Sequence, residues 1–228
     1  GDDAVRLQVH LPFDSDLKNN VDNSGDSSLV NSAHGYVTSS GCITQTEDGG
    51  KCFNRVSTSS AFVLGNQKPM AKSSILTWIK LTKLSGVQHI WLSSNIEKKY
   101  EKFFGIDASG YVFAQLSAEV QIKGTKKLAL NTWYHVAMLL NKQSGFEIYI
   151  NGMLDKFLKP VDTAQIDFPT PASNVRILDA IALYDDFRIY TGVVTQQHIL
   201  SIFSCGRTKK CANLALVAPQ SRRVYCLF

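Results

Sequence analysis

The acidic and nucleophilic side chains of this sequence lack the spacing that catalysis needs. Retaining glycoside hydrolysis, for example, requires two carboxyl groups about 5–5.5 Å apart. Asp185 and Asp186 are sequence neighbours, so on a regular strand they would point to opposite faces. The segment from Gly25 to Leu29, GDSSL, resembles the G-x-S-x-G turn of serine hydrolases only superficially, because no suitable strand precedes it. We therefore predict that the protein has no catalytic residues and is not an enzyme.

The histidines give no sign of a metal centre or a general base. No metal-ligand spacing relates the five of them, which are His10, His34, His89, His135 and His198. His135 lies in an apolar run, WYHVAMLL, and is interpreted as a hydrogen-bonded core or sheet residue rather than a base.

Cysteine placement predicts disulfides and an oxidising compartment. Cys42 and Cys52 bracket a polar segment, GCITQTEDGGKC, which is typical of a disulfide-closed loop, although two buried thiols would also fit. Cys205, Cys211 and Cys226 lie in the last 24 residues, and none of the five cysteines has C-x-x-C or zinc-site spacing. Five is odd, so one C-terminal cysteine is free or pairs outside this chain, and the pairings 205–211, 205–226 and 211–226 stay open. This pattern predicts a domain of a longer secreted protein, flanked by other domains.

The net charge of +5 is gathered in short clusters of cations. The C-terminal extension contains five of them, which we predict to bind an anionic partner in a salt-dependent way: Arg207, Lys209, Lys210, Arg222 and Arg223. Sulfated glycans, acidic matrix proteins and anionic lipids would all fit, and a merely solvated surface is the simpler alternative. Nucleic acid fits less well, because the clusters lack interleaved aromatic residues and no binding motif is present.

Hydrophobic alternation predicts an all-β protein. Residues 4–13 read as a half-buried strand with these residues on its inner face: Val5, Leu7, Val9, Leu11 and Phe13. Residues 14–34 are rich in Asp, Asn, Ser and Gly and predict a long loop. Further strand-like runs follow, with no apolar run approaching the roughly 20 residues that a membrane span needs.

Turn signals connect these strands into antiparallel pairs. Hairpins are predicted at residues 107–110, which end in Gly110, and at Asn151-Gly152. One short helix should follow Val194, with Thr195 as its N-cap. About a dozen strands and one C-terminal helix predict an all-β fold in which two antiparallel sheets form a sandwich.

A carboxylate on the strand at residues 181–190 raises a question of charge burial. If this strand is regular, Asp185 shares a face with the apolar Leu183 and Phe187, while Asp186 points the other way. A buried carboxylate needs a partner. We predict a calcium ion held by Asp14 and Asp185, with two alternatives: a salt bridge or hydrogen-bonded carboxylate, and a bulge that turns Asp185 outward.

Four motifs in order resemble the laminin-G-like jelly roll, within the concanavalin-like and pentraxin-like group of sandwiches. They are VHLPFDSDLKNNVDNSG, ILTWIKL, NTWYHVAMLLNKQSGFEIYINGML and YDDFRIYTGVVTQQHI. The resemblance implies a two-sheet domain over residues 1–204 and leaves residues 205–228 as a basic, cysteine-containing extension packed on the sandwich or leaving it. The loop at 42–52 and this extension depart from the family pattern.

The resemblance also implies a non-catalytic extracellular adhesion module that recognises a protein or an anionic glycan. A calcium-dependent lectin is one alternative, suggested by the acidic segment at 14–26 and by Tyr36. A structural spacer in an extracellular matrix protein, including a biomineral matrix, is another.

Overall fold

The computed structural model describes residues 5–11, 13, 35–43, 50–57, 62–64, 72–94, 102–117, 120–159 and 174–206. The predicted calcium ligand Asp14, the five cations of the C-terminal extension, Cys211 and Cys226 lie outside these residues. The division of the chain at residue 204 stays a prediction. No helix in the described part of the chain is long and apolar enough to cross a membrane.

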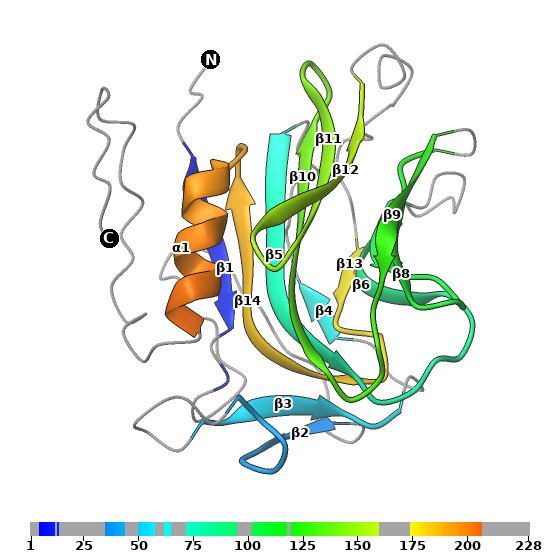
Figure 1. Cartoon of the computed structure of the whole chain (residues 1–228), viewed down its shortest axis with the longest axis vertical. Helices are drawn as coiled ribbons and strands as arrows, with labels where there is room; N and C mark the ends of the chain where they lie inside the picture. The colour runs from blue at the N-terminus through cyan, green and yellow to red at the C-terminus, as the bar shows by residue number, and fades with distance from the viewer. Residues whose placement is uncertain are drawn as a thin grey trace.

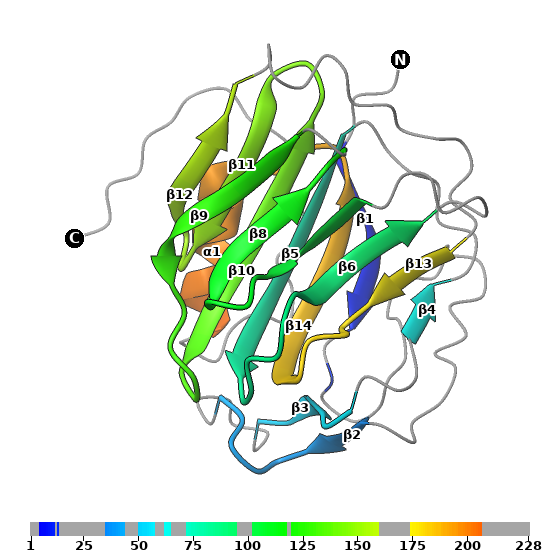
Figure 2. The ribbon, with the colours of Figure 1, turned by 90° about the vertical axis from the view of Figure 1, so that its right-hand side faces the viewer.

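Two antiparallel sheets form a sandwich, which confirms the predicted fold class (Figures 1 and 2). The eight-stranded sheet comprises β1 (Arg6–Leu11), β2 (Gly35–Thr38), β3 (Cys52–Arg55), β5 (Lys72–Leu81), β10 (Trp133–Asn141), β11 (Gly145–Ile150), β12 (Met153–Leu158) and β14 (Ala182–Thr191). Its order is β12-β11-β10-β5-β14-β3-β2, and β1 also pairs with β14.

The six-stranded sheet comprises β4 (Phe62–Leu64), β6 (Gln88–Ser94), β7 (Lys102–Ile106), β8 (Tyr111–Gln115), β9 (Gln121–Lys127) and β13 (Asn174–Ile177). Its order is β4-β13-β6-β7-β8-β9. The core lies between the two sheets and is built from alternate residues of both, such as Ile79 and Met138 from one and Phe104 and Ala114 from the other. Period-two alternation therefore places the remaining residues of each strand on an outer face.

The helix α1 (Gln196–Gly206) packs against the outer face of the eight-stranded sheet (Figure 1). Thr195 caps it as predicted, because its Oγ1 accepts a hydrogen bond from the backbone N–H of His198 at 3.2 Å. Ile199 and Ile202 are fully buried in a second apolar cluster that the helix shares with β5, β10, β11 and β14.

Both predicted hairpins form. Asn151 and Gly152 have φ of 53° and 78°, as a tight two-residue turn requires, and Gly110 has a φ of 91° at the end of the β7–β8 turn. The Asn151 side chain also accepts a hydrogen bond from the backbone N–H of His135 at 2.9 Å, which ties the hairpin to β10.

The first strand differs from the regular strand predicted at residues 4–13. The pairing of β1 with β14 shifts register between Leu7 and Val9, so Gln8 is an extra residue at a bulge. Val9 and Leu11 accordingly lie in the main core, whereas Val5 and Leu7 pack into the cluster beneath α1. The prediction that all five apolar residues share one face was wrong, because the bulge exchanges the two faces.

A buried ion cluster joins the two sheets near the start of β14. Asp179 lies in the connection from β13 to β14, and its carboxylate faces Arg55 of β3 at 3.2 Å and Arg176 of β13 at 2.7 Å. Arg55 is fully buried, whereas the Arg176 side chain is 40% exposed. Burial acts to raise the pKa of Asp179 and outweighs the two arginines, which act to lower it. The carboxylate is therefore the counter-charge that a buried guanidinium of β3 requires.

Asp179→Ala should lower the free energy of unfolding by about 3–5 kcal/mol, because it removes the carboxylate that faces a fully buried arginine. Arg176→Ala is the matched control: it removes a partly exposed partner of the same carboxylate and should cost less than about 1 kcal/mol. Denaturant unfolding of both variants measures the difference, and equal losses would contradict the assignment.

Candidate functional site

The structure replaces the predicted inward placement of Asp185 with a bulge. The pairing of β14 with β5 shifts register between Asp185 and Arg188, and Asp186 has a φ of 47°, so Asp186 is the extra residue. Ala182 and Tyr184 lie in the core before the bulge, and Phe187 and Ile189 after it. Asp185 therefore lies on the outer face, as the bulge alternative had it, and the premise of a regular strand was wrong.

The calcium site assigned to Asp14 and Asp185 stays a prediction, because Asp14 lies outside the described residues. Within the described residues, no group of three or more His, Cys, Asp or Glu side chains could hold a metal ion.

Asp186, rather than Asp185, is the centre of a charged network between β1 and β14. Its Oδ1 lies 2.7 Å from Nε2 of His10 and accepts a hydrogen bond from Nε of Arg188 at 2.8 Å. Nη1 of Arg188 donates to the hydroxyl of Tyr190 at 3.4 Å, and Nε2 of His198 in α1 lies 3.0 Å from that same hydroxyl. The network thus links the first strand to the helix.

The charges of this network fix its protonation state. Burial alone would raise the pKa of Asp186, but Arg188 and His10 lower it far below the usual range of a carboxyl. Burial also acts to lower the pKa of Arg188, and Asp186 reverses that effect. The pair is therefore a charged structural element of the fold.

His135 of β10 is fully buried beside this network, as predicted, but its two ring nitrogens have no hydrogen-bond partner among the described residues, so it is not the satisfied residue that the sequence suggested. Its ring lies 5.3 Å from that of Trp78 and 6.4 Å from that of Phe203 in α1, between centroids. Burial lowers the pKa of His135 to about 4, although Asp186 acts to raise it, and Arg188 reinforces the lowering. The imidazole is therefore neutral at physiological pH and forms part of the surface on which α1 packs.

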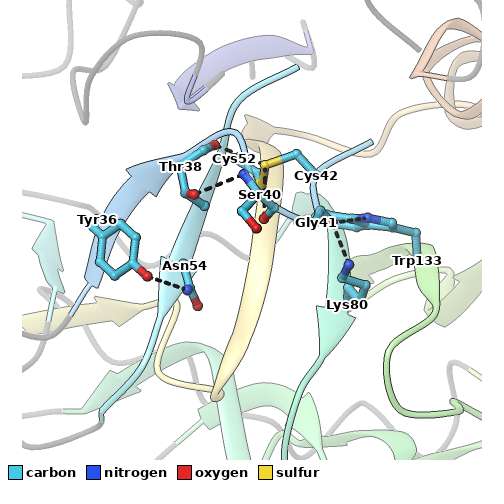
Figure 3. Close-up of a disulfide and its surroundings, with 9 residues drawn as sticks. All are labelled: Tyr36, Thr38, Ser40, Gly41, Cys42, Cys52, Asn54, Lys80 and Trp133. Atoms are coloured by element: carbon cyan, nitrogen blue, oxygen red, sulfur yellow. Dashed lines mark hydrogen bonds between the residues drawn. A yellow bond between two sulfur atoms is a disulfide. The ribbon is translucent and has the colours of Figure 1, made fainter. Parts of the chain in front are cut away.

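The predicted disulfide is confirmed. Cys42 and Cys52 are bonded, with a Cα–Cα distance of 5.5 Å, and both are buried against Leu183 of β14 (Figure 3). Cys205, at the end of α1, is also disulfide-bonded. Cys211 and Cys226 lie outside the described residues, so the pairing among the three C-terminal cysteines stays a prediction.

The disulfide holds the backbone of Gly41 over the outer face of the eight-stranded sheet. The carbonyl oxygen of Gly41 accepts a hydrogen bond from Nε1 of Trp133 at 3.1 Å and another from Nζ of Lys80 (Figure 3). Gly41 has a φ of 74°, and a Cβ there would lie 3.0 Å from Nζ of Lys80. The positive φ is what favours glycine here, because the lysine terminus could move to make room for a Cβ.

Strand register places the aromatic rings of Tyr36 and Trp133 on either side of the turn that carries Gly41. Directly opposed pairs run across five strands of the sheet, in the order Tyr36, Asn54, Leu183, Lys80, Trp133. At a strand spacing of about 4.8 Å, the backbones of Tyr36 and Trp133 are about 19 Å apart. Cys42 packs against Leu183 in the middle of this row. In Figure 3 the rings of Tyr36 and Trp133 lie on either side of the disulfide.

Both rings have their polar atoms occupied. The hydroxyl of Tyr36 accepts a hydrogen bond from the Asn54 amide at 3.2 Å, and the indole N–H of Trp133 is donated to Gly41. Tyr36 is 54% exposed, and Lys80 lies 5.6 Å from the centre of the Trp133 ring. We call the surface formed by Tyr36, Ser40, Gly41, Asn54, Lys80 and Trp133 the stapled face.

Of these residues, the sequence pointed only to Tyr36, although the predicted disulfide-closed loop at 42–52 begins directly after Gly41. Trp133, Lys80 and Asn54 come from three separate strands, and no local pattern relates them. The one sequence signal for this surface was that the loop at 42–52 departs from the family pattern.

A family model described as the concanavalin A-like lectin/glucanases superfamily, of the laminin G type, matches residues 53–200. The chain belongs to this superfamily. The resemblance that the four motifs predicted is therefore confirmed, and the two-sheet fold agrees with it. None of the curated protein sequences matches the chain.

Solved structures share the concanavalin A-like fold at low identity. Domain 4 of AbnA, a GH43 extracellular arabinanase from Geobacillus stearothermophilus in complex with arabinotriose, matches with a TM-score of 0.60 and 17% identity over 87% of this chain and 98% of that domain. The binding domain of Paraclostridial Mosquitocidal Protein 1 matches with a TM-score of 0.63 and 14% identity over 86% of this chain. The binding domain of botulinum neurotoxin serotype G matches with a TM-score of 0.58 and 12% identity over 87% of this chain. This chain spans 51% of each toxin structure, and these likenesses show the fold.

Asp186→Asn should lower the free energy of unfolding by about 3 kcal/mol, because it leaves the buried Arg188 without its counter-charge. Asp185→Asn, one position away on the outer face, should cost less. This order reverses the one expected for a regular strand. Thermal and denaturant unfolding of the two variants measure it, and a larger loss for Asp185→Asn would contradict the bulge assignment.

Acidification should destabilise the domain through His135. Its pKa is 6.5 when unperturbed and about 4 in the fold, so between these values the unfolded chain binds more protons than the folded one. Stability should therefore fall as the pH drops from about 6.5 to about 4, by about 3 kcal/mol in total. His135→Leu should flatten this part of the profile, whereas His198→Leu should retain most of it. An unchanged slope in His135→Leu would refute the assignment.

Proposed function

We propose that this concanavalin A-like domain is a non-catalytic extracellular recognition module that binds a glycan through the stapled face. The observation that carries the proposal is the pair of aromatic rings, Tyr36 and Trp133, whose polar atoms are already hydrogen-bonded within the protein. Such rings offer a ligand chiefly their apolar faces. The C–H face of a sugar ring packs well on an aromatic face of this kind.

The stapled face also offers polar groups that sugar hydroxyls need. Asn54 contributes an amide, and Ser40 is exposed in the turn between β2 and Cys42. Lys80 places a cation beside the Trp133 ring. Convergent apolar and polar groups of this sort are typical of small-ligand sites. Because Asn54 and Lys80 stand on paired strands and Ser40 lies just before the disulfide-bonded Cys42, little ordering should be needed on binding.

Two further observations support the proposal. The disulfides at Cys42–Cys52 and at Cys205 favour an oxidising, extracellular compartment. The arabinanase domain of similar fold was solved in complex with arabinotriose, which makes a glycan the first ligand class to test here.

A protein ligand is the second candidate function for the same face. Tyr, Ser, Gly, Asn and Trp are the residues that dominate antibody binding loops, and the stapled face presents all five types. The calcium-dependent lectin and the matrix spacer remain alternatives, and the test below separates them.

Screening the chain against an array of oligosaccharides, in calcium and in chelator, tests the proposal. We expect binding to a defined set of glycans, weakened about tenfold by Tyr36→Ala or Trp133→Ala, which corresponds to about 1.4 kcal/mol. Phe157→Ala is the matched control, because Phe157 is 41% exposed on β12, away from this face.

Each other outcome has a definite meaning. Absence of glycan binding in both buffers would overturn the proposal and leave the protein-binding and spacer functions. Binding that both aromatic variants retain would move the site away from the stapled face. Loss of binding in chelator alone would favour the calcium-dependent lectin.

A further inference from the structure

The helix α1 covers an apolar area on the outer face of the eight-stranded sheet (Figure 1). Beneath it lie Leu76, Ala137 and Leu139, each at most 2% exposed. Ile199 and Ile202 of the helix are fully buried against this area. These five residues are separate from the main core between the two sheets. The contact of α1 with the sheet is therefore an apolar unit of its own, which can open while that core stays intact.

His135 and Trp78 bring buried polar atoms into this contact. The ring centre of Phe203 in α1 lies 6.4 Å from that of His135 and 5.5 Å from that of Trp78. Nδ1 and Nε2 of His135 and Nε1 of Trp78 are buried and have no hydrogen-bond partner in the part of the chain that the structure describes. Burying these atoms unpaired costs free energy, which the apolar packing of α1 must offset. Water would bond all three atoms if the helix moved away.

A second imidazole lies in the helix itself. His198 stands in the first turn of α1, and its Nε2 lies 3.0 Å from the hydroxyl of Tyr190. That hydroxyl also accepts a hydrogen bond from Nη1 of Arg188 at 3.4 Å. Burial lowers the pKa of His198, and the positive charge of Arg188 lowers it further. A proton on His198 would therefore place a second cation beside a buried guanidinium.

Other charged and titratable groups share the outer face with the two imidazoles. They are His10 of β1, Lys80 of β5, Glu147 and Tyr149 of β11, and Asp185, Asp186, Arg188 and Tyr190 of β14. Asp186 is paired with His10 and Arg188, and Glu147 accepts a hydrogen bond from Tyr149 at 2.7 Å. Burial dominates the pKa of His135 and lowers it, although Asp186 acts to raise it, and Arg188 reinforces the lowering. Both imidazoles are therefore neutral at neutral pH while α1 is closed.

We infer that α1 is an acid-sensitive lid: protonation of His135 and His198 shifts the helix to a released state in which the two-sheet sandwich stays folded. Both rings meet water in the released state, so both then bind protons near the ordinary pKa of histidine. Because the closed state binds these protons more weakly, acid favours release. The inference does not depend on the stapled face.

Release changes the surface that the sheet offers to other molecules. It uncovers the apolar side of α1 and the area around Leu76 and Leu139 at the same time. The disulfide between Cys42 and Cys52, which holds the β2–β3 end of the sheet, lies in a different cluster and stays in place. The lid therefore gives the domain an apolar interaction surface whose exposure increases with acidity.

Hydrogen exchange of the full chain at about pH 7.5 and about pH 5, corrected for the intrinsic exchange rate, tests the inference. The opening constant of α1 should rise about 30-fold through His135 alone, since its pKa is 6.5 when unperturbed and about 4 in the closed state. Amides of β7 and β8 in the six-stranded sheet should keep their protection over the same range.

Variants show whether the two imidazoles cause this change. His135→Leu should remove most of the rise, and the double variant His135→Leu/His198→Leu should remove nearly all of it. His89→Leu is the matched control: it removes an imidazole from β6 of the other sheet and should leave the rise unchanged.

Three results would overturn the inference. The first is corrected exchange of α1 that is the same at both pH values in the wild-type chain. The second is loss of protection in β7 and β8 together with α1, because the transition would then be unfolding of the whole domain. The third is a double variant that keeps the full rise. The first two are measured on the wild-type chain, so the test stands even if a His135 variant fails to fold.

Discussion

The bulge at Asp186 determines which side chains of β14 lie in the core and which lie on the outer face of the sheet. β14 pairs with β1, β3 and β5, so its side chains decide what lies in the core and what lies beneath the helix. Two residues, Asp185 and Asp186, separate Tyr184 from Phe187, and both of these aromatic residues lie in the core. Only an extra residue permits this spacing, because a regular strand would send one of them outward. The ion pair between Asp186 and Arg188 then stabilises a backbone conformation that few residues adopt.

Much of the fold could be predicted from the sequence because its signals are local. Alternation identified the strands, Asn151-Gly152 and Gly110 identified hairpins, and Thr195 identified the start of the helix. The disulfide was predictable because a polar segment between two cysteines is a local signal as well. These features require no knowledge of which strands are neighbours.

The positions of the bulges at Gln8 and Asp186, and the stapled face, could not be fixed from the sequence, for a common physical reason. A bulge changes the phase of alternation without changing composition, and β14 gives no phase signal, since Ala182, Leu183 and Tyr184 are all buried. The stapled face depends on register across five strands from distant parts of the chain. A single sequence specifies hydrophobic faces well, whereas pairing between distant strands is decided by the packing of the whole domain.

The sandwich architecture also explains where recognition can occur. The inner faces of both sheets form the core. The helix α1 covers the middle of the outer face of the eight-stranded sheet with the fully buried Ile199 and Ile202. Among the described strands, this leaves the β2–β3 end of the eight-stranded sheet, its β12 edge with the exposed Met153, Leu154 and Phe157, and the outer face of the six-stranded sheet.

The end of the eight-stranded sheet can present rigid aromatic rings only because several tertiary interactions hold it. β2 and β3 are four residues long each, and β3 pairs with β14 through two residue pairs, which is too little for a stable extension alone. Three interactions compensate: Phe53 stacks on Phe13 at 5.6 Å, Arg55 meets Asp179, and Cys52 binds Cys42. Because the disulfide also fixes the Gly41 carbonyl that holds Trp133 and Lys80, the bond that secures this strand pair also orients one of the two rings.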